Sequence, residues 1–350
     1  MTLESFELIR LLLVTTAAFL LAFALAPLLI RWLVAHKMGK SIRIAAETPV
    51  FAEMHAKKAG TPTMGGILVW GTVLILAIGF AAAGRLFPGS YVDKLSFLSR
   101  PQTLLPLGAL VASALVGLVD DYLNVRRIGA HGGGLRARHR LLVYALIAAV
   151  GAWWFYAKLD WDLLHVPFLG TFNIGWWYIP FFLFVIVATA FSVNETDGLD
   201  GLAGGTLFSA FAAYAVIAFA QGRYDLAAFC GAIIGALLAF LWFNIHPARF
   251  FMGDTGAMSL GVTLGVIALL TNAAFLLPVI GLVFVLETVS VLVQVSWRKL
   301  FKRKLLKSAP FHHHLEASGW PEPQIVMRLW VVAFVCAALG VAVALLDALI

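Results

Sequence analysis

The stretch "LIRLLLVTTAAFLLAFALAPLLIRWLV" (residues 8–34) is apolar and long enough to cross a bilayer as a helix, since about 20 such residues suffice. Nine further runs of this kind follow: 62–83, 103–119, 139–157, 176–192, 201–220, 225–243, 255–271, 273–297 and 326–349. The 350-residue chain is 62% hydrophobic and 12% charged, with a mean hydropathy of +0.94. Because backbone groups in lipid must be satisfied within their own segment, we expect an all-α, polytopic integral membrane protein with about ten transmembrane helices.

The positive charges of the loops set the expected orientation. Residues 35–61 hold five Lys and Arg and residues 298–325 hold six, whereas the loops after the second, fourth and sixth runs hold three, one and one. Cytoplasmic loops of membrane proteins are enriched in Lys and Arg. We therefore expect the odd-numbered loops in the cytoplasm and both termini outside. The net charge of +7 then suits anionic headgroups or a phosphorylated substrate at the cytoplasmic face.

Five polar segments fall on the loops of this expected cytoplasmic side. They are "HAKKAGTPTMGG" (55–66), "VDDYLNVRR" (119–127), "NETDGLDGLAGG" (194–205), "FNIHPARFFMGDTG" (243–256) and "APFHHHLEASGWPEP" (309–323). Five such loops on one face indicate an active site rather than a pore, whose polar residues would run through the bilayer. We expect one transmembrane catalytic domain over residues 1–350. We expect no nucleic-acid partner, because the chain has no soluble domain to bind one.

Three aspartates are candidate metal ligands. Asp120 and Asp121 end the third run, where adjacent carboxylates repel each other and oppose the helix dipole. They are either solvated or offset by a cation, such as Arg126, Arg127 or a metal ion. Asp254, in "GDTG", would alone be a candidate helix cap. Together on one face, the three carboxylates form a hard-oxygen set suited to Mg²⁺.

A glycine-rich turn carries Asp197 and Asp200 three residues apart. Capping of the following helix is one interpretation of this pair. The glycines at 198, 201, 204 and 205 favour another, in which the backbone approaches a ligand closely. On the neighbouring loops Lys58 could reach a phosphate, and a ring of the Phe250–Phe251 pair could stack on a base.

The three consecutive histidines, 312–314, raise the question of a zinc site. Zinc ligands must converge on one point, whereas consecutive side chains diverge, and no cysteine falls in a cytoplasmic loop. We therefore favour hydrogen bonding to a pyrophosphate or tuning of an aspartate. Glu287 is the one carboxylate well inside an apolar run, with Ser290 and Gln294 at helical spacing. It serves either function or an interhelical hydrogen bond.

The order of these segments resembles that of the bacterial phospho-N-acetylmuramoyl-pentapeptide transferases, within the polyprenyl-phosphate N-acetylhexosamine-1-phosphate transferase superfamily. The matching motifs are "GTPTMGG", "DDY", "NETDGLDGL", "FNIHPARFFMGDTG" and "PFHHHLE" followed by "GWPEP". The resemblance implies a Mg²⁺-dependent phosphoglycosyl transferase of the bacterial inner (cytoplasmic) membrane. It would transfer phospho-MurNAc-pentapeptide from UDP-MurNAc-pentapeptide to undecaprenyl phosphate, which forms lipid I and UMP in peptidoglycan synthesis.

The resemblance also implies roles for single residues, carried over by position. The catalytic set would be Asp120, Asp121, Asp254, His312 and His313, with Mg²⁺ at Asp254 and Asp121. The nucleotide pocket would comprise Lys58, Thr63, Asn194, Asp197, Gly198, Leu199, Asp200, Asn244 and Phe251, the last stacking on uracil. The ninth apolar run would line a groove for the lipid tail.

Three features depart from the family pattern. Glu195 stands at a position that is usually apolar, Ala257 stands where a serine is common, and "IGAHGGG" (128–134) lengthens its loop. They bear on substrate detail rather than on the reaction. The alternatives are a relative that transfers N-acetylglucosamine-1-phosphate and a secondary transporter of an anionic solute, which would place its binding residues near the midplane. A homodimer is compatible with the sequence.

Overall fold

The computed structural model describes residues 2–39, 58, 60–100, 102–129 and 133–350, and its long helices confirm the all-α fold. These helices are α1 (Leu3–Ala35), α3 (Gly66–Leu86), α4 (Leu104–Val125), α5 (Ala137–Lys158), α6 (Tyr178–Thr196), α7 (Leu202–Ala220), α8 (Tyr224–Asn244), α9 (Gly253–Leu270), α11 (Leu282–Phe301) and α13 (Glu322–Asp347). Within the described residues, nine single helices are long and apolar enough to cross a membrane, and one bent pair makes a tenth. Each predicted run coincides with one of them. The glycine-rich stretch 128–134 and the segment 55–66 lie partly outside the described residues.

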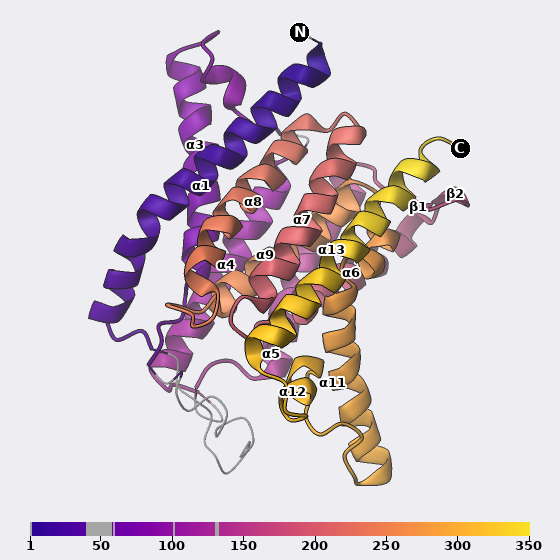
Figure 1. The fold of residues 1–350 in the computed structure, drawn as a ribbon. Helices are drawn as coiled ribbons and strands as arrows, with labels where there is room; N and C mark the ends of the chain where they lie inside the picture. Colours follow the sequence, from indigo (N-terminus) through magenta and orange to yellow (C-terminus); the bar gives the residue numbers. More distant parts are fainter. Residues whose placement is uncertain (1, 40–57, 59, 101, 130–132) are drawn as a thin grey trace.

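The centre of the bundle is formed by α7, α8 and α9, most of whose residues are buried (Figure 1). Glycines allow close approach at two crossings. At Gly235 of α8, a Cβ atom would lie 2.1 Å from the carbonyl oxygen of Thr15 in α1. At Gly117 of α4, a Cβ atom would lie 2.4 Å from the carbonyl oxygen of Asp254 in α9. Close van der Waals packing of this kind holds helices together in lipid. The second crossing also brings the end of α4 to the start of α9.

The ninth apolar run, predicted as one span over 273–297, is broken. The 3₁₀ turn η4 (Ala274–Leu276) and α10 (Leu277–Ile280) form its first part, and α11 continues at 83° to them after Gly281. Both parts are apolar, so hydropathy alone could not show the bend. Beyond it α11 extends away from the bundle (Figure 1). Gln294 of α11 holds the following loop, because its side-chain oxygen accepts the backbone N–H of Leu306 at 2.9 Å.

Short elements connect the long helices. Strands β1 (Leu163–Val166) and β2 (Gly170–Asn173) form an antiparallel hairpin with Leu163 opposite Asn173, which the all-α interpretation did not include. His165 of β1 donates from Nε2 to Asp347 at the end of α13 at 2.5 Å, so the hairpin is tied to the C-terminal helix. The remaining short helices are η2 (Asp93–Leu95), η3 (Gly175–Trp177) and α12 (Phe311–Glu316).

Figure 1 shows the start of α1, the end of α13 and the hairpin toward one end of the bundle, and α12 at the opposite end. Both ends of the chain therefore lie toward the same end of the bundle. Which side faces the cytoplasm stays a prediction from the loop charges. The histidines of α12 lie at the end away from both termini.

Candidate active site

Side chains from four helices form a charged ring, which we call the carboxylate–arginine centre: Asp120 (α4), Arg140 (α5), Asn194 (α6) and Asp254 (α9). Asp120 is fully buried, and Arg140 Nε lies 2.7 Å from its Oδ2. Arg140 Nη2 lies 3.1 Å from Asp254 Oδ2. Asn194 closes the ring, because its Nδ2 donates to Asp254 Oδ1 at 2.6 Å and its Oδ1 accepts from Arg140 at 3.2 Å. Two carboxylates thus share one guanidinium.

Asp121 is bound to the start of α9. Its Oδ1 accepts the backbone N–H of Asp254 at 3.1 Å, and its Oδ2 accepts that of Thr255 at 3.0 Å. The first N–H groups of a helix have no partner within the helix, and they carry partial positive charge. Thr63 adds its hydroxyl to Asp121 at 3.4 Å. Gly253 has φ +73°, and a Cβ atom there would lie 2.5 Å from Asp121 Oδ2, so only glycine fits.

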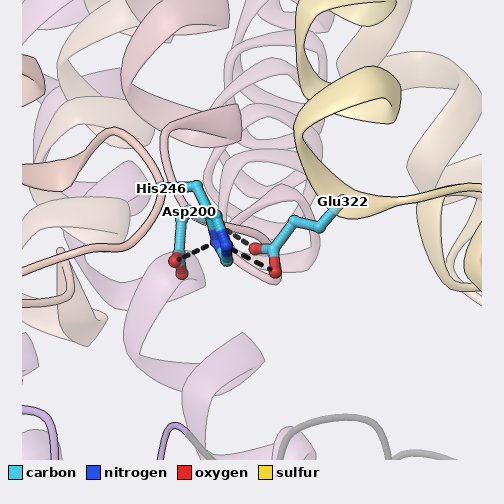
Figure 2. Close-up of side chains that lie close together, drawn as sticks. All are labelled: Asp200, His246 and Glu322. Carbon is cyan, nitrogen blue, oxygen red and sulfur yellow. Dashed lines mark hydrogen bonds and ion pairs between the residues drawn. The ribbon is translucent and has the colours of Figure 1, made fainter.

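A second charged group, which we call the lysine cluster, comprises Lys58, Asp200, His246 and Glu322. Figure 2 shows Asp200, His246 and Glu322 turned toward one another from three separate parts of the chain. Lys58 Nζ lies 2.7 Å from Asp200 Oδ1 and 2.5 Å from Glu322 Oε1, and His246 Nδ1 donates to Asp200 Oδ2 at 3.0 Å. Ligand atoms of the three residues in Figure 2 lie within 4.8 Å of one another, a spacing that a metal ion could use. The ammonium of Lys58 already supplies a cation there.

The turn 197–200 joins the two charged groups. Asp197 Oδ2 accepts the backbone N–H of Gly253 at 3.2 Å, next to Asp254, while Asp200 belongs to the lysine cluster. The capping interpretation is wrong for this turn. The N-cap of α7 is Gly201, and no side chain forms a capping hydrogen bond at the start of this helix. Leu199 is buried and packs in a cluster with Ile325 and neighbouring apolar residues of α13.

Two residues of the predicted nucleotide pocket differ in accessibility. Asn244 is buried, and its amide joins the backbone of Gly201 (2.9 Å) to that of Phe250 (2.8 Å), so it shapes the pocket from behind. Phe251 is half-buried, with Lys58 Nζ 5.9 Å from its ring centroid, which leaves part of the ring for contact with a ligand. Phe250 is fully buried against Phe240, and it is not available for stacking.

The three histidines of α12 point to three different partners. His312 is fully buried, and its Nδ1 donates to Glu287 of α11 at 3.0 Å. His313 Nδ1 donates to Glu316 at 2.6 Å within the same short helix. His314 Nδ1 accepts the backbone N–H of Lys307 at 3.2 Å. The side chains diverge, as expected for consecutive residues, and Glu287 makes the interhelical hydrogen bond that was one of its two interpretations.

Sequence reasoning missed three residues of these groups. Arg140 was not singled out, because a single Arg beside a predicted cytoplasmic loop is explained by the enrichment of Lys and Arg on the cytoplasmic side of the membrane. His246 and Glu322 stand inside quoted motifs, yet neither was given a role. The signal for Glu322 was its place in "GWPEP", directly after the histidines. What the sequence could not show is that Lys58 and Glu322, 264 positions apart, share one ion pair.

The donor atoms at the carboxylate–arginine centre are of the chemical type that Mg²⁺ binds. Carboxylate and amide oxygens are hard ligands, and Mg²⁺ in enzymes is commonly held by one or two carboxylates together with substrate phosphates. Within the described residues Arg140 is the one cationic side chain that pairs with Asp120 and Asp254, which leaves negative charge for a further cation to offset. Asp121 of α4 accepts the backbone N–H of Asp254 at the start of α9.

The described residues form a bundle of nine long apolar helices and one bent pair, with charged groups at the helix ends. Residues 103–272 match the model of glycosyl transferase family 4, which assigns this membrane protein to the transferases. Residues 58–68 match the phospho-N-acetylmuramoyl-pentapeptide-transferase signature 1. The chain is 40% identical to the phospho-N-acetylmuramoyl-pentapeptide-transferase of Chloroflexus aurantiacus, covering 97% of this chain and 91% of that protein. It is 41% identical to that of Geobacillus kaustophilus (93% and 94%) and 39% identical to that of Bacillus subtilis (92% and 94%). The chain therefore belongs to the phospho-N-acetylmuramoyl-pentapeptide transferase family.

Proposed function

We propose that this chain transfers phospho-MurNAc-pentapeptide from UDP-MurNAc-pentapeptide to undecaprenyl phosphate at the bacterial inner membrane. An oxygen of the lipid phosphate attacks the phosphorus attached to the sugar. The bond from that phosphorus to the bridging oxygen breaks, UMP leaves with the bond electrons, and lipid I remains. The observation that carries this proposal is the pair of charged groups, one carboxylate-rich and one containing a lysine, joined by the turn 197–200.

The proposed nucleotide pocket includes Lys58 and Asp200 of the lysine cluster and Asn194 of the carboxylate–arginine centre. Its residues are Lys58, Thr63, Asn194, Asp197, Gly198, Leu199, Asp200, Asn244 and Phe251. Phe251 offers a partly exposed ring on which uracil can stack, and Lys58 lies beside that ring. Asp200 holds Lys58 in place at 2.7 Å. Asn244 and Leu199 support the pocket from the buried side.

The proposed metal ligands are Asp254 and Asp121. Asp121 also fixes the first turn of α9, so it orients the backbone that carries Asp254. A Mg²⁺ ion held there would neutralise the charge that develops on the transferring phosphoryl group. Arg140 lies against both Asp120 and Asp254, and it is the protein's own cation at this position.

Asp120 is proposed to orient or deprotonate the acceptor phosphate. A phosphate monoester has a second pKa of about 6, so near neutral pH the acceptor is already largely dianionic and needs little help from a base. Most of the barrier then falls through positioning and charge neutralisation. His313 is almost buried beside Glu316 and is proposed to donate to the pyrophosphate of the donor. His312 supports the site from a fully enclosed position.

The lipid acceptor must enter from the bilayer. Beyond its bend, α11 carries exposed apolar side chains, among them Leu286, Val289, Leu292 and Val293. We propose that this face guides the polyprenyl tail while the phosphate reaches the carboxylate–arginine centre. We expect this end of the bundle to face the cytoplasm, because its loops carry the excess of Lys and Arg.

A radiolabelled transfer assay tests the function. Purified protein, undecaprenyl phosphate and Mg²⁺ should yield labelled lipid I and UMP with UDP-MurNAc-pentapeptide, and no lipid product with UDP-N-acetylglucosamine. Chelation with EDTA should stop the reaction. Transfer from UDP-N-acetylglucosamine alone would assign the chain to the simpler sugar, and movement of intact donor across vesicles without transfer would indicate a transporter.

A further inference from the structure

A carboxylate–imidazole pair is enclosed between the bent span and the short helix α12. Glu287 of α11 and His312 of α12 are both 0% exposed. Glu287 Oε2 accepts two hydrogen bonds from the same residue, one from His312 Nδ1 at 3.0 Å and one from the backbone N–H of His312 at 3.2 Å. The double contact fixes both the position of the α12 backbone and the rotation of the imidazole ring.

Two polar atoms of this pair have no hydrogen-bond partner among the described residues. They are Glu287 Oε1 and His312 Nε2. Polar groups buried without partners reduce stability, and an apolar pair of similar volume would avoid that cost. The pair is therefore poorly explained as a device for stability alone.

The far side of the imidazole ring presses on the nucleotide turn. A Cβ atom added to Gly198 would lie 2.2 Å from His312 Nε2 and 2.7 Å from its Cε1. The ring thus fills the space that a side chain at position 198 would need. On either side of Gly198 the turn carries Asp197, bound to the backbone of Gly253, and Asp200, bound to Lys58.

We propose that Glu287 is a positioning residue for the nucleotide donor: it holds the His312 ring against Gly198 and thereby sets the turn 197–200. The inference rests on the proposed function, because the turn matters only if it binds the donor. His312 is enclosed on all sides, so it acts through the turn rather than on the reacting atoms. The pair also links the bent span to the nucleotide pocket, and the affinity for the lipid acceptor should not depend on it.

The experiment measures binding of UDP-MurNAc-pentapeptide to full-length protein in detergent, by calorimetry, with no lipid phosphate present. Glu287→Ala and His312→Ala should each weaken binding by about tenfold, the loss expected when a buried hydrogen-bond partner is removed. The double variant should bind no more weakly than either single variant, because both changes release the same ring. Glu287→Gln should lose only about threefold, since its amide oxygen still accepts both N–H groups.

Thr288→Ala is the matched control. Thr288 follows Glu287 on α11 and donates to Ser192 of α6 at 2.7 Å, so its removal disturbs α11 without touching His312. It should leave donor affinity unchanged. If Glu287→Ala does not fold, Gly198→Ala is the second test variant. Its methyl group should displace the His312 ring from the opposite side and should also weaken donor binding.

Three results would overturn the inference. They are donor affinities unchanged in Glu287→Ala and Gly198→Ala, losses that multiply in the double variant, and a lower kcat with unaltered donor affinity. Failure of the proposed function itself would look different, because the unsubstituted protein would then neither bind the donor nor form lipid I.

Discussion

The Asp120 side chain is 0% exposed, so water cannot solvate its carboxylate. A buried charge is tolerated when it is paired and hydrogen-bonded. Arg140 provides the pairing at 2.7 Å, and the backbone N–H of Leu135 donates to the other oxygen at 2.5 Å. The same guanidinium reaches Asp254 at 3.1 Å. One arginine thus pairs with two carboxylates and holds both toward the same place.

Replacing Arg140 by Gln should therefore reduce both activity and stability. Removing one partner of a buried ion pair typically costs about 3 kcal/mol, which should lower the melting temperature measured in detergent. Added Mg²⁺ should raise the melting temperature of this variant more than that of the unsubstituted protein, since the ion takes over a cation's position. Arg138→Gln is the control, because Arg138 is exposed and forms no ion pair with a carboxylate of the described residues. An equal response to Mg²⁺ in both proteins would contradict this account of the centre.

At the scale of the element, α9 owes its position to Asp121 and to two glycines. Asp121 accepts the N–H groups of Asp254 and Thr255, and its charge is favourable at a helix N-terminus. Gly117 lets α4 approach that first turn, and Gly253 leaves room for the Asp121 carboxylate. The orientation of Asp254 is therefore set by the packing of α4 against α9.

Asp121→Asn and Asp254→Asn should consequently differ. Loss of the helix cap should cost Asp121→Asn about 1–2 kcal/mol of stability, together with activity. Asp254→Asn should change the melting temperature little, but it should raise the Mg²⁺ concentration for half-maximal rate on the order of tenfold. Asp121→Asn should raise the Mg²⁺ requirement as well, so thermal unfolding, measured beside a Mg²⁺ titration of the transfer rate, is what separates the two variants. A metal requirement shifted by Asp121→Asn alone would reverse the assigned roles.

Most of the elements were predictable, because a membrane-spanning helix can be recognised from the length of its apolar run. Each of the ten predicted runs overlaps a long helix or the bent pair of the described residues, with ends that differ by up to six residues. The bend at Gly281 was not predictable, since η4, α10 and α11 are apolar on both sides of it. The hairpin was missed as well, because strands of four residues carry too little pattern to be distinguished from a loop.

At the scale of the whole molecule, the side of the membrane that the site faces is predicted from the loop charges. A Cys336→Ser background removes the native cysteine that is not fully buried. On it, Ser318→Cys beside α12 should react with an impermeant thiol reagent only after the membrane is opened. Ser90→Cys, in the loop after α3, should react from outside. The reverse pattern would overturn the topology and move the site away from the cytoplasm.

The sequence predicts a set of candidate residues, and their roles stay predictions. Every candidate residue lies in the described part of the chain. Which of them contact one another depends on how the helices pack. Sequence spacing could not pair Arg140 with Asn194, or separate the half-buried ring of Phe251 from the enclosed ring of Phe250.

Direct attack of the lipid phosphate on the donor is the central mechanistic claim, and isotope exchange tests it most directly. Delipidated protein with UDP-MurNAc-pentapeptide, Mg²⁺ and labelled UMP is assayed for label entering the donor. Without undecaprenyl phosphate no exchange should occur, and adding the lipid phosphate should start it, because lipid I must form before UMP can return. Robust exchange in the complete absence of lipid phosphate would require a covalent enzyme intermediate, for instance on an aspartate, and would contradict the single displacement.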